Sequence, residues 1–128
     1  MNKEFLEPYN KKLLEQTLER IKPNTISSFD LTQKNRDLLN KYYKFLVNEG
    51  IAITRQRLVL GVLGRLLVML NKDFETAIKD DIEELVTKIR GRNISPVTQS
   101  DYLKKLKQFD KWFNGGEEPS ERTRKTKL

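Results

Sequence analysis

One segment constrains the fold more than any other: Ile53 to Leu70, ITRQRLVLGVLGRLLVML, is the most apolar stretch of the chain. Its leucines and valines recur at steps of three and four residues, the spacing of a buried helical face. We expect this segment to be the central helix of the core, with Thr54 as its N-cap. The predicted buried face comprises Leu58, Val59, Val62, Leu63, Leu66, Leu67 and Leu70.

A narrower stripe on the same helix combines two glycines, Gly61 and Gly64, with Arg57 and Arg65. Glycine lowers helix propensity, but its missing side chain lets another backbone approach closely. We therefore expect another segment of the chain to pack against the two glycines.

The first turn of this helix carries an unusual charge. Arg55 and Arg57 lie near its amino end, where free backbone N–H groups and the helix dipole are already positive. Two cations are unfavourable there unless an anion binds, and phosphate is the obvious anion. The turn, with Thr54 and Gln56, is therefore a candidate phosphate-binding site.

Two helices are predicted before the central one. The first has Pro8 in its first turn and runs to about Lys22. The second is capped by Thr32, continues through Asn48 and ends at Gly50. Their predicted inward faces are Leu13, Leu14, Leu18 and Ile21, and Leu38, Leu39, Tyr42, Phe45 and Leu46.

Two further helices are predicted after it. The fourth begins with the capping pattern of Asp80 and Glu83 and ends at Gly91. The fifth begins at Ser95, which a proline follows, and runs to about Phe113. Their predicted inward faces are Ile82, Leu85, Val86 and Ile89, and Tyr102, Leu103, Leu106, Phe109, Trp112 and Phe113.

No strand pattern or internal repeat is present, so we expect an all-α fold, a compact bundle of about five helices. A length of 128 residues suits a single domain. We divide it into an N-terminal helix and linker at residues 1–30, a core helical domain at residues 31–114, and a basic tail or linker at residues 115–128.

The chain contains neither cysteine nor histidine. This excludes disulfides, thiolate metal sites, most zinc chemistry and the Ser-His-Asp and Cys-His nucleophiles, so we expect no cofactor and no metal. The acidic residues from Asp80 to Glu84 are better explained by helix capping than by cation binding. Because no signal peptide or membrane-spanning segment is evident, we expect a cytoplasmic protein without a membrane partner.

Lysine and arginine total 25 against 18 acidic residues, a net charge of +7 that favours an acidic partner such as nucleic acid. A second basic helix start, RGRNISPVTQS at residues 90–100, resembles ITRQR at residues 53–57. Arg92 could neutralise a phosphate, and Thr98 and Gln99 could bond to phosphates or base edges. The alternative is that these polar residues are ordinary caps and the arginines are solvated.

Lysines of the fifth helix lie largely outside its apolar face. Such a run is usually the solvated face of a helix, but Lys105 lies on the same side as Thr98 and could follow a DNA backbone. The lysines are Lys104, Lys105, Lys107 and Lys111.

The order of these elements resembles the SAM-like core-binding domain of phage-integrase-type tyrosine recombinases, over roughly residues 31–121. The motifs are FLVNEGIA followed by ITRQRLVLGVLGRLLVML, then DDIEEL, Ser95-Pro96-x-Thr98, Tyr102-Leu103 and Phe109-x-x-Trp112-Phe113. The NGGEEP segment looks particularly like archaeal members of the family.

The resemblance implies one half of a clamp around a recombination site, with two helices directing their amino ends at double-stranded DNA. They match the helices that open at Thr54 and Ser95. The family's catalytic residues belong to a following domain, so we expect no enzyme activity and no small-molecule substrate in this fragment, with residues 115–128 leading toward that domain. Other recombinase protomers are implied as partners on DNA. The implied DNA-binding residues are Thr54, Arg55, Gln56, Arg57, Arg92, Thr98, Gln99 and Lys105.

Within this set we expect the cations to contact phosphates and Gln56, Thr98 and Gln99 to read bases. Two other functions stay open. The arginines could contact an acidic protein partner of a helical protein-interaction module, or the chain could be a small enzyme, which would require a convergent polar pocket.

Overall fold

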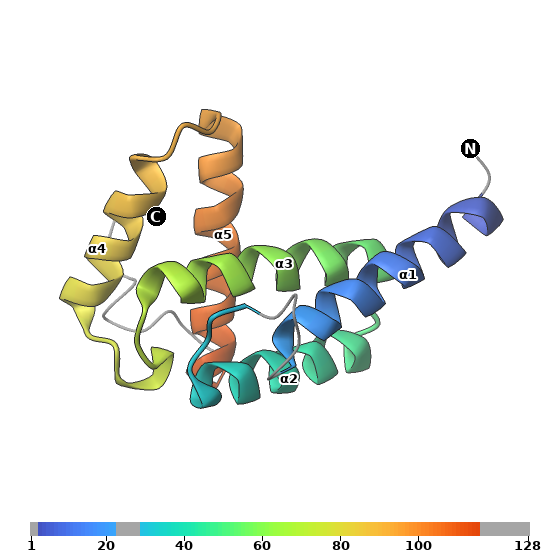
Figure 1. Ribbon diagram of the computed structural model, residues 1–128, viewed down its shortest axis with the longest axis horizontal. Helices are drawn as coiled ribbons and strands as arrows, with labels where there is room; N and C mark the ends of the chain where they lie inside the picture. Colours follow the sequence, from blue (N-terminus) through green and yellow to red (C-terminus); the bar gives the residue numbers. More distant parts are fainter. Residues whose placement is uncertain (1–2, 23–28, 116–128) are drawn as a thin grey trace. The chain divides into compact units, whose positions relative to one another are not determined.

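The described part of the chain is helical throughout. The computed structural model describes residues 3–22 and 29–115, and within them five α-helices and a short 3-10 helix follow one another without a strand (Figure 1). This confirms the all-α prediction. The elements are α1 (Lys3–Ile21), α2 (Gln33–Asn48), α3 (Ile53–Leu70), η1 (Phe74–Thr76), α4 (Lys79–Arg90) and α5 (Pro96–Phe113).

The chain divides into two compact units, Met1–Arg65 and Leu66–Leu128, and α3 runs through the boundary. The predicted boundary at residue 30 falls inside the first unit. Most of the predicted tail, residues 116–128, lies outside the described residues. The division into residues 1–30, 31–114 and 115–128 stays a prediction.

Helix α1 begins earlier than its proline indicates. It starts at Lys3 and contains Pro8, so the prediction of Pro8 as a first-turn residue is wrong. Proline lacks the N–H that would bond to the carbonyl of Glu4, so α1 forms with this one hydrogen bond missing.

Helix α2 has the predicted limits because both of its ends are specified locally. The hydroxyl of Thr32 accepts a 3.1 Å hydrogen bond from the backbone N–H of Asn35. Beyond the other end, Gly50 has φ of +71°, a left-handed conformation that glycine adopts at little cost. Tyr42 is buried and Phe45 half-buried on the predicted inward face.

A buried arginine connects α1 to α2. Arg36 donates from Nη1 to the carbonyls of Ile21 and Lys22 at 2.7 and 3.1 Å, and from Nη2 to the carbonyl of Phe29 at 2.5 Å. It therefore satisfies carbonyls that the end of α1 leaves unpaired.

The ring of Phe29 fills the space that the missing side chain of Gly64 leaves on α3. A Cβ built on Gly64 would lie 2.7 Å from Cδ2 of Phe29, and the guanidinium of Arg20 lies 4.0 Å from the ring centroid. The close approach predicted at Gly64 is thus made by a side chain rather than a backbone. At Gly61 the prediction is wrong, since among the described residues no atom outside the backbone of α3 and the neighbours of Gly61 lies within 4 Å of a built Cβ.

Helix α3 spans the predicted Ile53–Leu70, but two details of the prediction are wrong. Thr54 lies inside the first turn and therefore is not the residue that precedes the helix. Leu58 is 46% exposed, whereas Leu60, which was not assigned to the buried face, is fully buried.

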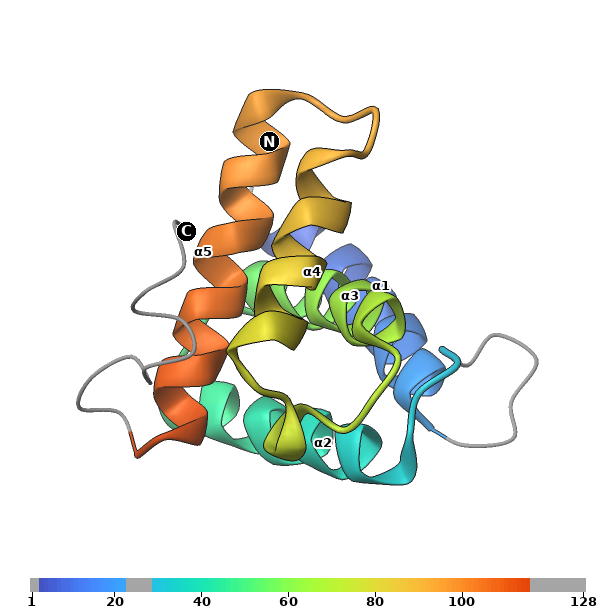
Figure 2. The same cartoon turned by 90° about the vertical axis from the view of Figure 1, so that its left-hand side faces the viewer.

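In the second unit, α4 and α5 run side by side and are joined by residues 91–95 (Figures 1 and 2). Phe74 of η1 is fully buried and packs on Phe109 and Phe113 of α5, with ring centroids 4.8 and 5.4 Å apart. The inward face predicted for α4 is buried, and Ser95 caps α5 as predicted.

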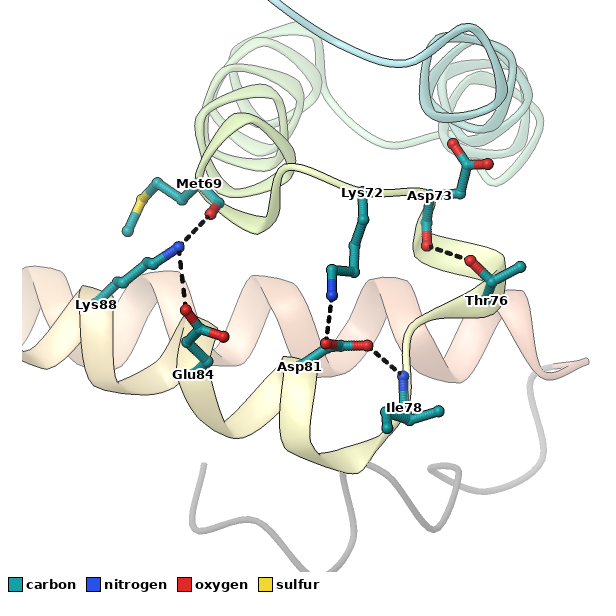
Figure 3. A network of polar contacts seen from close by, with 8 residues as sticks. All are labelled: Met69, Lys72, Asp73, Thr76, Ile78, Asp81, Glu84 and Lys88. Carbon is teal, nitrogen blue, oxygen red and sulfur yellow. Dashed lines mark hydrogen bonds and ion pairs between the residues drawn. The ribbon is translucent and has the colours of Figure 1, made fainter.

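The start of α4 differs from the predicted capping pattern. The N-cap is Ile78, and its backbone N–H donates at 2.9 Å to Asp81, whose other carboxylate oxygen accepts at 2.6 Å from Lys72 (Figure 3). The prediction of Asp80 and Glu83 as the capping pair is therefore wrong by two residues. At the other end of α4, Lys88 donates to the carbonyl of Met69 at 3.0 Å (Figure 3).

Candidate nucleic-acid interface

The start of α3 presents one polar side chain to the protein and two residues to solvent. Thr54 and Arg55 are exposed. Gln56 is only 6% exposed, and its Nε2 donates at 2.8 Å to the carbonyl of Ile51 in the turn between α2 and α3. Its side chain therefore holds this turn against the first turn of α3.

The two arginines of this turn differ in burial. Arg57 is half-buried, and its Nε is buried without a hydrogen-bond partner. Arg55 is exposed and close enough to Tyr42 of α2 to act on it electrostatically: burial raises the pKa of the Tyr42 hydroxyl, and the Arg55 guanidinium opposes part of the rise. Arg55 is therefore the more accessible cation for an incoming anion.

The turn between α4 and α5 carries Arg92. This side chain is exposed, and its Nη1 lies 3.3 Å from the thioether sulfur of Met69. A thioether is a weak acceptor and neutralises no charge, so the guanidinium keeps its capacity to bind an anion.

The polar residues at the start of α5 are bonded within the protein. The backbone N–H of Thr98 donates to Oγ of Ser95 at 3.2 Å, and the two hydroxyl oxygens lie 2.9 Å apart. Nε2 of Gln99 donates to the carbonyl of Ile94 at 3.3 Å and lies 3.5 Å from the carbonyl of Arg90. Thr98 and Gln99 are both half-buried.

The two helix starts are therefore built alike. In each, a glutamine at the fourth helical position donates its amide to the carbonyl of the isoleucine five residues earlier: Gln56 to Ile51 and Gln99 to Ile94. The sequences IAITRQ and ISPVTQ contain this spacing. This shared spacing of isoleucine and glutamine is the sequence signal for the two hydrogen bonds. These bonds are missed when the glutamines are interpreted only as residues that face a ligand.

Lys105 lies about two helical turns beyond Thr98 on α5 and is paired internally. Its Nζ contacts a carboxylate oxygen of Asp101 at 2.5 Å, and its side chain is 14% exposed. Lys104, Lys107 and Lys111 are exposed on the same helix. Of the lysines on α5, the one predicted to contact phosphate is thus the least accessible.

The predicted site residues fall into two groups. Thr54, Arg55, Gln56 and Arg57 belong to the first unit, whereas Arg92, Thr98, Gln99 and Lys105 belong to the second. Within the second unit, Arg92, Thr98 and Gln99 meet around one turn. Each group has an exposed arginine beside a glutamine that is bonded to the backbone.

The described residues contain no group of three or more acidic, cysteine or histidine side chains able to hold a metal ion. A surface depression at the start of α5 is lined by Pro96, Val97, Ser100, Asp101 and Lys104. Val97 there is 80% exposed. No helix among residues 3–22 and 29–115 has the length and hydropathy needed to cross a membrane.

No known protein family, curated protein or solved structure matches this chain.

Proposed function

We propose that this chain is a DNA-binding module of a tyrosine site-specific recombinase, which helps to clamp the recombination core site and leaves catalysis to other parts of that enzyme. Other recombinase protomers assembled on the DNA, and a cytoplasmic location, are parts of the same proposal. The order of helices and motifs that resembles the core-binding domain supports it. The net charge of +7 agrees with a polyanionic ligand.

One observation carries the proposal: the two helix starts share a construction, and each presents an exposed arginine. Arg55 lies beside Gln56 on α3, and Arg92 lies in the turn that Gln99 bonds. At α3, backbone N–H groups of the helix start and the neighbouring guanidinium of Arg55 favour the same ligand, a phosphate oxygen. At α5 the N–H of Thr98 is bonded to Ser95, and the guanidinium of Arg92 supplies the charge. Two such starts in one chain suit a polymer of phosphates.

The first prediction concerns the salt dependence of binding. Binding of a short fluorescent duplex, followed by anisotropy between about 50 and 200 mM salt, should weaken steeply because each neutralised phosphate releases counterions. Arg55→Ala and Arg92→Ala should each make the slope of log affinity against log salt shallower by about one. Both arginines are exposed, so neither change should unfold the protein.

Two lysines serve as charge-matched controls. Lys22 directly follows α1, and its carbonyl accepts a hydrogen bond from Arg36 near the start of α2. The start of α3 follows the opposite end of α2, so Lys22 is not part of that helix start. Lys79 opens α4, at the end opposite the turn that contains Arg92. Lys22→Ala and Lys79→Ala should leave the slope unchanged. Absence of binding at the lowest salt would exclude this function and favour an acidic protein partner; equal effects of arginine and control variants would exclude the two helix starts.

A further inference from the structure

The residues suited to read bases are engaged inside the protein. Bidentate recognition of adenine by glutamine requires both the amide N–H₂ and the amide oxygen at the base edge. Nε2 of Gln56 is bonded to the carbonyl of Ile51, and the residue is 6% exposed. A base edge would have to displace this bond and uncover a buried side chain.

The start of α5 repeats this arrangement. Nε2 of Gln99 is shared between the carbonyls of Ile94 and Arg90, and the Thr98 hydroxyl lies 2.9 Å from that of Ser95. These contacts connect α5 to the last residue of α4 and to the turn between the helices. The same turn carries Arg92, so Gln99 fixes the backbone from which that guanidinium extends.

We propose that Gln56 and Gln99 are positioning residues, each holding the turn beside an exposed arginine, and that this part of the protein binds duplex DNA through phosphates, irrespective of base sequence. The inference rests on the proposed function and deepens it. Phosphate contacts fix the position of a protein on DNA but carry no sequence information. Base selection is therefore assigned to parts of the recombination machinery other than these two helix starts.

The test measures the affinity of the full chain for three duplexes of equal length: one A·T-rich, one G·C-rich and one mixed. Wild-type dissociation constants should agree within about threefold, because one good bidentate base contact alone discriminates by about fivefold or more. Gln99→Met keeps the length of the side chain and removes the donor. It should weaken binding to all three duplexes by one common factor of about two to five, since fewer molecules hold the turn in its binding geometry.

The matched control is Gln108→Met on the same helix, where the glutamine is exposed; it should bind all three duplexes as the wild type does. Far-UV circular dichroism checks that each variant is folded at the assay temperature. Gln56→Met, at the more buried site, provides a second variant with the same expected common factor.

Each other outcome overturns part of the proposal. If Gln99→Met weakens one preferred duplex and spares the others, Gln99 reads bases and the positioning role is wrong while the DNA-binding function stands. If a folded Gln99→Met variant binds every duplex like the wild type, the hydrogen bond is merely structural and the positioning role is also wrong. If the wild type binds no duplex at low salt, the proposed function fails, and this inference fails with it.

Discussion

Gly64 and Gly61 allow the same substitution to be tested with opposite expected signs. Alanine at position 64 would place its Cβ against the ring of Phe29, which Arg20 covers and whose carbonyl Arg36 binds. Such overpacking costs about 1–3 kcal/mol, more than the gain in helix propensity. Gly61→Ala meets nothing and should stabilise by about 0.5–1 kcal/mol.

Urea unfolding of the two variants provides the measurement. A Gly64→Ala variant as stable as Gly61→Ala would mean that Phe29 does not occupy this position in solution.

Individual residues show where sequence reasoning ended. Burial at Leu60 rather than Leu58 shifts the apolar face of α3 toward the side that its neighbours cover. The sequence contains both leucines at helical spacing and does not specify where the neighbouring helices lie. Gln56 was likewise predictable as a residue of the helix start, but its partner, the carbonyl of Ile51, is a backbone atom that the sequence pattern does not reveal.

The junction of α1 with α2 depends on one side chain. Arg36→Met would remove the hydrogen bonds to the carbonyls of Ile21, Lys22 and Phe29, although the carbonyl of Phe29 keeps the N–H of Leu31 as a donor. This should lower the free energy of unfolding by about 3 kcal/mol. Arg36→Lys keeps the charge but lacks the planar guanidinium that bonds to three carbonyls. Its free energy of unfolding should therefore lie between those of the wild type and of Arg36→Met.

Urea unfolding gives the size of each loss, and amide hydrogen exchange shows where it falls. Amide exchange should increase first along α1, because the carboxyl end of this helix loses its hydrogen bonds from Arg36 of α2. If amide exchange became faster to the same extent across the second unit as well, a local role for Arg36 would be contradicted.

The start of α4 makes a prediction about acid stability. The hydrogen bond from Lys72, and then that from the backbone of Ile78, lower the pKa of Asp81 below its ordinary value of 3.8. A lowered folded-state pKa means that the stabilisation is complete above 3.8 and is lost as the pH falls through the folded value. Asp81→Asn should therefore lose less stability than the wild type over this acidic range.

Thermal unfolding followed at a series of acidic pH values provides the comparison. Asp80→Asn, which changes the neighbouring carboxylate but not the bonds to Lys72 and Ile78, should retain the decline of the wild type. Identical profiles for wild type and Asp81→Asn would show that these bonds do not persist in solution.

The limits of helices were predictable where short-range chemistry specifies them. Thr32, Gly50 and the Ser95-Pro96 pair act on groups within four residues, and the predicted limits of α2 and α5 are correct. The predicted start of α4 was displaced by two residues because Asp81 and Glu83 are both acceptable as the acidic residue of a helix amino end. The bond from Lys72, nine residues before Asp81, lies outside any local pattern.

For the whole protein, the absence of histidine predicts that the net charge changes little with pH near neutrality. Histidine is the side chain whose ordinary pKa lies nearest neutrality, and the chain has none. The net charge of +7 should therefore hold between about pH 5.5 and 7. The DNA affinity that we propose should then stay constant within about twofold at constant ionic strength. Anisotropy titrations across this range provide the measurement. A steep change of affinity with pH would instead implicate a carboxylate with a strongly raised pKa on the part of the protein that is proposed to bind DNA.

The fold class and five helices followed from the periodicity and capping signals of the sequence. The assignment to a recombinase family stays a prediction, because a helical pattern is compatible with many functions and DNA binding depends on how side chains gather in space. The glutamine contacts illustrate this limit, since they engage two polar residues that a sequence pattern would leave available to a ligand.

The fit of Phe29 onto Gly64 also has an evolutionary consequence. The two positions share one volume, so neither can change size alone without cost. Among related chains, a larger residue at position 64 should accompany a smaller one at position 29, and the pair should covary despite a separation of 35 positions. Where an N-terminal segment of this kind is missing, the requirement for glycine at position 64 should disappear with it.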